Sequence, residues 1–359
     1  MVEGPLRAWL SAARVLNGSD LLLVAGRPPM VRAGGSLHAV DGADLTTDDI
    51  ASATGPLVPG RLQEAFTSGE AIDLAFSAAE LGRFRMNLHF ERGRVAAAIR
   101  ALPTSVPALD SLGFSHDISS LARLPRGLLL VCGPTGSGKT TTVAAIVGEI
   151  NANYDRHIVT IEDPVEYEHA HGRCLVEQVE IGVDAPSFPV ALRAALRQAP
   201  DVIVIGEMRD TESIRIAVTA AETGHLVIAT VHAPDVTGAI ARVADAFPAE
   251  RQNTIRQELA MGLAAILAQT LVPAADGRLV PAAELLIVSY GARQHIRKNA
   301  LQHLHQEMTT TRRLGSFTME ESLAALVRAG RLERPTAALR AAHPEELDLL
   351  LAGGSAPRT

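Results

Sequence analysis

A stretch that could hold a chain of phosphates stands near the middle of the sequence. It reads Gly133, Pro134, Thr135, Gly136, Ser137, Gly138, Lys139 and Thr140, which fits the pattern G-x-x-x-x-G-K-[ST] at every position. Glycines at these positions let backbone N–H groups surround a phosphate. We predict that Lys139 reaches the β- and γ-phosphates of a nucleotide and that the Thr140 hydroxyl ligates Mg²⁺. Thr141, the next residue, is predicted to belong to the same site.

Acidic residues follow two apolar segments downstream of this loop. The first group, Glu162, Asp163 and Glu166, comes after residues 157–161. A carboxylate there could orient and deprotonate an attacking water, although a solvated acidic turn would have the same composition. Glu207 comes after residues 202–205, where phosphate-loop enzymes place an acid on Mg²⁺ or its water shell. The alternative for Glu207 is a surface acid after a core strand.

Two histidines flank a third apolar segment, residues 226–230. A neutral imidazole at the end of that strand, such as His232 or His225, could sense the γ-phosphate. A structural role is the alternative for each histidine.

The order of these segments predicts the fold class. Residues 128–132 and 141–150 read as a buried strand and a helix on either side of the loop. Across residues 125–290 strands and helices alternate, which favours an α/β core with a mostly parallel sheet. Residues 210–222 and 250–271 are predicted helices. Residues 1–102 are expected to form a small α/β domain, residues 103–124 a linker region, and residues 291–359 a helical region with a loose tail.

Composition limits the class of function. The 359 residues predict about two domains, and no apolar run approaches the ~20 residues of a membrane span. Two cysteines cannot form a four-cysteine zinc site, and the absence of an export-like start favours a cytoplasmic protein. A net charge of -7 and only 3% aromatic residues argue against nucleic-acid binding.

Taken together, these motifs resemble the secretion-type hexameric ATPases, and within them the type IV pilus retraction ATPases (the twitching-motility PilT group). The matching segments are residues 162–166 (the aspartate box), 206–210 (the Walker B region), 219–225 with 230–232 (the histidine box), 18–23 with 26–30, 83–87 with 92–93, and 292–297. The resemblance implies a PAS-like N-terminal domain, a RecA-like P-loop ATPase domain and a ring of six identical subunits.

The resemblance also implies roles by position. Glu166 would be the catalytic base, Glu207 the acid at Mg²⁺ and water, and His232 with His225 the phosphate-sensing pair. Arginines of the N-terminal domain would complete the ATP-binding site, and the candidates are Arg83, Arg85, Arg92 and Arg94. The expected partners are other copies of the chain and an inner-membrane pilus platform protein. The location would be cytoplasmic, at the inner membrane without insertion, and no nucleic-acid partner is expected.

Three positions depart from the group's pattern: Leu22, Ala233 and Lys298. They leave Lys139, Thr140, Glu166 and Glu207 intact. They bear more on retraction than on hydrolysis, because the helix around Arg297 is linked with that activity in the group. The alternatives are a pilus extension or type II secretion ATPase, a nucleic-acid translocase, and a non-hydrolysing accessory ring subunit.

Overall fold

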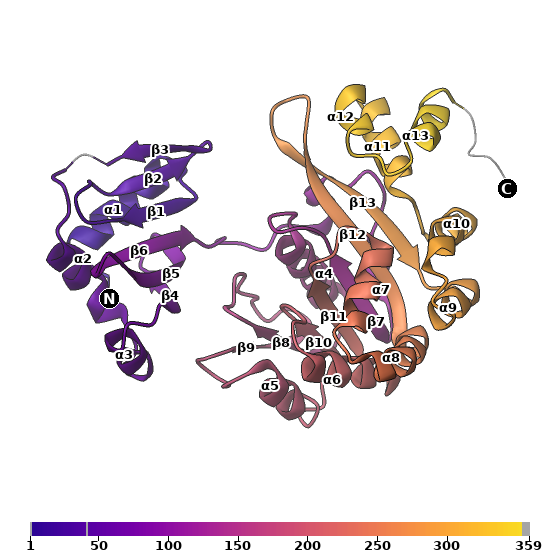
Figure 1. Ribbon diagram of the computed structural model, residues 1–359, viewed down its shortest axis with the longest axis horizontal. Helices are drawn as coiled ribbons and strands as arrows, with labels where there is room; N and C mark the ends of the chain where they lie inside the picture. Colours follow the sequence, from indigo (N-terminus) through magenta and orange to yellow (C-terminus); the bar gives the residue numbers. More distant parts are fainter. Residues whose placement is uncertain (1, 41, 354–359) are drawn as a thin grey trace. The chain divides into compact units, whose positions relative to one another are not determined.

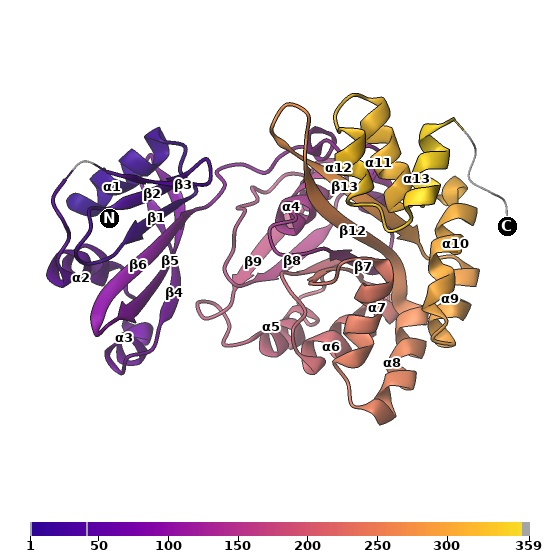
Figure 2. The same ribbon diagram turned by 45° about the horizontal axis from the view of Figure 1, so that its top comes forward.

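The computed structural model describes residues 2–40 and 42–353, and it divides into two compact units. The first unit contains Met1–Ser105 together with the short segment Pro164–Glu168. The second contains Val106–Asp163 and His169–Thr359. Each unit has its own sheet (Figures 1 and 2). Each unit also has its own buried core. Among the described helices, none is long and apolar enough to cross a lipid bilayer.

The first unit is an antiparallel sheet with helices packed on one face. The strand order is β3 (Ser36–Ala39), β2 (Met30–Ala33), β1 (Asp20–Leu23), β6 (Arg94–Ala101), β5 (Gly82–Glu91) and β4 (Ile72–Ala78). The helices are α1 (Pro5–Val15), α2 (Thr47–Thr54) and α3 (Gly60–Thr67). Leu6 and Leu10 of α1 and Ile50 of α2 are buried with the inner residues of the sheet. Thr46 and Asp49 form a capping box that begins α2.

Strand β5 shows why this sheet has two different faces. Phe84, Met86 and Leu88 are each at most 1% exposed and belong to the core of the unit. Because side chains alternate along a strand, Arg83 and Arg85 project from the opposite face. The alternation expected from the sequence is therefore present, and it places the arginines away from the helices.

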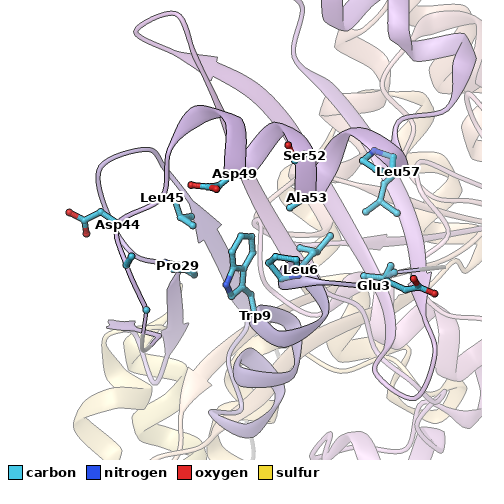
Figure 3. Close-up of a pocket in the computed structure, with 15 residues that line it drawn as sticks. Glu3, Leu6, Trp9, Pro29, Asp44, Leu45, Asp49, Ser52, Ala53 and Leu57 are labelled. Carbon is cyan, nitrogen blue, oxygen red and sulfur yellow. The ribbon is translucent and has the colours of Figure 1, made fainter.

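The first unit also contains a hollow of about 460 Å³ beside α1 and α2. Leu6, Trp9, Leu45 and Leu57 are among the side chains that line it (Figure 3). None of the site residues predicted from the sequence lines this hollow.

The second unit is built on a larger, mostly parallel sheet. Its strand order is β13 (Leu279–Ile287), β12 (Leu263–Pro273), β7 (Gly127–Cys132), β11 (Leu226–Val231), β10 (Val202–Ile205), β8 (His157–Glu162) and β9 (Leu175–Glu180). Every neighbouring pair in this order is parallel except β12 with β13. This confirms the α/β class and the strands predicted at residues 157–161, 202–205 and 226–230.

Helices cover both faces of the second sheet. Helix α4 (Lys139–Asn153) lies on one face, where Ile146 and Ile150 are buried against β7 and β11. The other face packs against α5 (Phe188–Ala195), α6 (Thr211–Glu222), α7 (Val236–Asp245) and α8 (Ala249–Gly262). Asp210 accepts a hydrogen bond from the Ser213 amide and so begins α6, as the sequence predicted.

The prediction of one helix across residues 250–271 is wrong. Helix α8 ends at Gly262, and strand β12 starts at Leu263. Residues Ala265–Ala268 are fully buried and pair in parallel with β7. A short apolar run is compatible with either a helix or a strand. Here the run forms a strand, which is hydrogen-bonded to β7.

The rest of the second unit extends this core. Residues 109–112 and 119–123, within the expected linker region, form 3₁₀ turns whose Leu109 and Leu121 are buried beneath α4. The C-terminal region contains α9 (Tyr290–Arg297), α10 (Leu304–Thr310), α11 (Met319–Arg328), α12 (Arg334–Ala338) and α13 (Pro344–Leu351). Helices α11 to α13 share a small core with β12 and β13. Most of the predicted tail, residues 354–359, lies outside the described residues.

Candidate nucleotide-binding site

The phosphate loop connects a fully buried strand to the start of a helix. Gly138, with φ of 86°, is the N-cap of α4 and supplies no side-chain capping bond. No side chain at the N-cap therefore accepts a hydrogen bond from the first backbone amides of α4. Amides of this kind at a helix N-terminus commonly bind anions such as phosphate. Thr140 and Thr141 lie in the first turn of this helix.

Lys139 is held inside the loop by the loop's own carbonyl groups. Its Nζ donates to the carbonyl oxygens of Gly133 (2.9 Å) and Pro134 (3.0 Å), and the residue is 8% exposed. Burial lowers the pKa of Lys139, while the nearby carboxylate of Glu207 opposes that effect.

His232 lies between the lysine and the acid. The Nζ of Lys139 is 3.5 Å from Nδ1 of His232, and Nε2 of His232 is 3.5 Å from Oε1 of Glu207. Glu207 also accepts a 2.7 Å hydrogen bond from Arg209. Burial raises the pKa of Glu207, but Arg209, His232 and Lys139 together outweigh it, so the net pKa is lowered. The carboxylate is thereby kept ionised next to the loop.

The sheet topology explains why these three residues meet. The loop follows β7, His232 follows β11 and Glu207 follows β10, and these strands are adjacent and parallel in that order. The C-terminal ends of parallel strands lie at one edge of the sheet, where α/β proteins bind ligands. Gly206 allows the close approach of β8, since an added Cβ would lie 3.3 Å from the Glu162 Cα.

Glu162 is fixed at the end of β8. Its Oε1 accepts hydrogen bonds from Thr160 Oγ1 (2.7 Å) and from Gln178 Nε2 (3.2 Å). These donors orient the carboxylate. Asp163 is the last residue of the acidic group that belongs to the second unit.

His225 lies apart from this arrangement within the chain, and its role with His232 in a phosphate-sensing pair stays a prediction. His225 precedes β11, whereas His232 follows it, so the two histidines flank opposite ends of a six-residue strand. Six residues of strand separate them by on the order of 20 Å. The carbonyl of His225 accepts from the Gly127 amide, at the start of β7 rather than at the loop that follows its end.

Gln269 of β12 is a site residue that the sequence analysis did not identify. Its Nε2 donates to the Ser137 carbonyl at 2.7 Å, and both residues are 2% exposed. The buried atoms Gln269 Oε1 and Ser137 Oγ have no hydrogen-bond partner among the described residues. The loop backbone passes so close to β12 that an added Cβ on Gly133, whose φ is 152°, would lie 2.2 Å from the Gln269 carbonyl oxygen. The signal available in the sequence was a glutamine within the mostly apolar run of residues 263–273.

The remaining predicted site residues belong to the first unit. Glu166 lies in the segment Pro164–Glu168, which belongs to the first unit, whereas the phosphate loop belongs to the second. The four arginines each contact a carboxylate there: Arg83 with Glu168, Arg85 with Asp73, and both Arg92 and Arg94 with Glu91. Arg83 also donates to the Val165 carbonyl at 3.0 Å, which ties the segment to β5.

The chain is similar to a known protein family. Residues 78–345 match the family described as "Type II/IV secretion system protein". The chain belongs to this family. It is a nucleotide-binding ATPase, in keeping with an intact phosphate loop and with the relatives described next.

Two relatives from Pseudomonas aeruginosa cover most of the chain. One, described as "Type IV pilus retractation ATPase PilT", is 38% identical over 329 residues, 92% of this chain and 96% of its own. The other, "Type IV pilus ATPase PilU", is 37% identical over 340 residues, 94% of this chain and 89% of its own. A solved structure titled "Crystal Structure of the Pilus Retraction Motor PilT and Bound ADP" superposes with a TM-score of 0.87 at 39% identity, covering 96% of this chain and 99% of that one.

Proposed function

We propose that this chain is an ATP-driven motor that powers retraction of a type IV pilus. The observation that carries the proposal is the row of polar contacts from Lys139 through His232 to Glu207, at the ends of three adjacent parallel strands. A triphosphate at the loop would contact the first of these residues, and the last would lie at its metal. The descriptions of the two Pseudomonas relatives and of the similar solved structure support the pilus assignment.

The residues of the site fit Mg²⁺ chemically. Thr140 offers a hydroxyl oxygen at the start of α4, and Glu207 offers a carboxylate whose pKa is lowered by its cationic neighbours. Mg²⁺ prefers such hard oxygen ligands and, when bound, neutralises part of the phosphate charge. In the proposed cycle Thr140 and Glu207 hold the ion.

Lys139 and His232 supply a means of sensing the nucleotide. When Lys139 binds phosphate oxygens, it releases the carbonyls of Gly133 and Pro134 and shifts its interaction with Nδ1 of His232. Because the other nitrogen of His232 faces Glu207, this change reaches the carboxylate. The imidazole therefore links the state of the phosphates to the position of the acid.

The remaining parts of the mechanism rest on the resemblance to pilus retraction ATPases. Glu166 is proposed as the base that orients and deprotonates water. The arginines of the first unit, Arg83, Arg85, Arg92 and Arg94, are proposed to balance charge on the transferred phosphoryl group. Six copies of the chain are proposed to form a ring. The ring would act on a pilus platform protein at the cytoplasmic side of the inner membrane.

The experiment that tests the proposal measures ATP hydrolysis by the purified chain and pilus retraction in a strain that lacks it. Glu166→Gln should abolish turnover and keep ATP binding, and it should fail to restore retraction. Glu70→Gln, an exposed acid of the same unit, serves as the control and should restore both. Normal retraction in the strain without this chain would contradict the motor assignment. Unchanged turnover in Glu166→Gln would remove that residue from the role of base.

The three alternatives each give a result that differs from that of a retraction motor. A nucleic-acid translocase would hydrolyse ATP faster when DNA or RNA is added, and we expect no stimulation. An accessory subunit would bind ATP without releasing phosphate. Loss of pilus assembly in the strain without this chain would instead favour an extension or secretion ATPase.

A further inference from the structure

Three potential metal ligands meet where the C-terminal helices pack together. His305 comes from α10, Glu320 from α11 and Glu346 from α13. One ligand atom from each lies within 4.8 Å of the others. His305 Nε2 and Glu346 Oε2 are already 2.7 Å apart. The group lies outside the nucleotide site, and the function proposed above does not use it.

Glu320 is buried, His305 and Glu346 are partly buried, and neighbouring groups orient the side chains. Glu320 is 1% exposed, and its Oε1 accepts a 2.8 Å hydrogen bond from the His343 amide. Thr318 Oγ1 donates to Glu346 Oε1 at 3.4 Å. The ring of His343 lies 4.3 Å from that of His305, measured between centroids. Such outer contacts are what hold metal ligands in position in known sites.

Charge provides an independent observation. In the described parts of the chain, neither lysine nor arginine forms an ion pair with Glu320, with Glu346 or with the nearby Glu284, which is 7% exposed. Among the described residues, the imidazole of His305, which pairs with Glu346, is the only cationic partner that forms an ion pair with these carboxylates. A carboxylate buried to 99% is costly without a cationic partner. The site therefore has an excess of buried negative charge that a divalent ion would balance.

We propose that His305, Glu320 and Glu346 bind a structural divalent transition-metal ion of the Zn²⁺ class. An imidazole together with two carboxylates favours Zn²⁺, Co²⁺ or Mn²⁺ over Ca²⁺ or Mg²⁺, which prefer all-oxygen sites. Ligand bonds of about 2.0–2.2 Å in a tetrahedral site place neighbouring ligand atoms roughly 3.4 Å apart. Ligand atoms now up to 4.8 Å apart must therefore approach one another, whereas His305 Nε2 and Glu346 Oε2, now 2.7 Å apart, must separate. On binding, His305 loses its proton and its Nε2 turns from Glu346 to the metal, so one ion fixes α10, α11 and α13 to each other.

The test uses the purified full-length chain, stripped with EDTA and free of nucleotide. Co²⁺ is added as a spectroscopic probe, and Zn²⁺ is then used to displace it. We expect one equivalent of Co²⁺ per chain, with visible absorption bands of a low-symmetry site, and a higher melting temperature with metal than with EDTA. His305→Gln and Glu320→Gln should each weaken binding at least tenfold.

Matched controls separate this site from other histidines and acids. His303→Asn changes an exposed histidine two residues away, and Glu345→Gln changes the exposed neighbour of Glu346, so both should bind Co²⁺ as the unaltered chain does. Glu207→Gln should also retain binding, which excludes the nucleotide site. The result for the unaltered chain is decisive by itself. If the unaltered chain does not bind one equivalent of Co²⁺, the proposal is refuted. Equal binding by the unaltered chain and His305→Gln would also refute it.

Discussion

Gln269 donates a hydrogen bond from Nε2 to the carbonyl oxygen of Ser137, although the two residues are 132 positions apart in the sequence. Both side chains are almost fully buried, so this bond joins strand β12 to the phosphate loop without competition from water. Because β12 continues through β13 into the core of the C-terminal helices, the loop is attached to the far part of its own unit.

We predict that Gln269→Leu weakens nucleotide binding several-fold and lowers the free energy of unfolding by about 1–3 kcal/mol. The substitution keeps the volume but leaves the buried Ser137 carbonyl without its donor. Titration with a fluorescent ATP analogue and hydrogen exchange of the β12 amides measure the two effects. Gln198→Leu, at an exposed position, is the control. Unchanged binding would show that β12 does not fix the loop.

Gly133 and Gly136 offer a comparison within the loop itself. At Gly133 an added Cβ would lie 2.2 Å from the Gln269 carbonyl oxygen, whereas at Gly136, with φ of 77°, it would meet nothing within 4 Å. Gly136→Ala should cost only the backbone strain of about 1–2 kcal/mol. Gly133→Ala should cost about 1–3 kcal/mol more, because the loop must also move away from β12. Urea unfolding monitored by hydrogen exchange in β7 gives the comparison, and Trp9 fluorescence, which reports the first unit, should be the same in both variants. Equal costs would contradict the predicted clash.

His232 and His225 test whether position along β11 decides function. His232→Asn should reduce hydrolysis by about 10- to 100-fold while ATP binding is retained, because the contact that relays Lys139 to Glu207 is lost. His225→Asn, at the opposite end of the strand, should leave binding at the loop unchanged. Steady-state hydrolysis and equilibrium binding of ATP separate the two effects. A normal rate in His232→Asn would exclude the relay.

Glu284 makes the stability of the second unit depend on pH. Burial raises the pKa of this carboxyl to about 7, and the nearby acids Asp235 and Glu320 act in the same direction against the Val236 amide. Since the folded state holds the proton more tightly than the unfolded state, stability is lost as pH rises from about 4.5 to 7 and is then constant. The loss is on the order of 3 kcal/mol.

Glu284→Gln should remove this dependence. The amide oxygen can still accept from the Val236 N–H, and no charge is buried at high pH. Relative to the unaltered chain, the variant should therefore be more stable at pH 8 than at pH 5, measured by urea unfolding in EDTA. Glu345→Gln is the exposed control. A variant whose stability follows that of the unaltered chain at both pH values would disprove the prediction.

Features that depend on neighbouring residues could be predicted from the amino-acid sequence. The phosphate loop, its flanking strand and helix, the acid after β10 and the alternation of β5 are local patterns, and each is present in the structure. Local spacing fixes which backbone conformation a short segment prefers and which side chains share a face. It was sufficient for the α/β class and for the strand, loop and helix around Lys139.

Contacts between distant segments could not be predicted in this way and became visible in the folded chain. Residues 263–271 became strand β12 because β7 offered hydrogen bonds, and Gln269 thereby reached Ser137. The parallel register placed His232 at the loop and His225 at the other end of β11. His305, Glu320 and Glu346 lie on three separate helices whose packing brings them together. No periodicity along the chain encodes these contacts, since each depends on the burial of surfaces contributed by remote parts of the sequence.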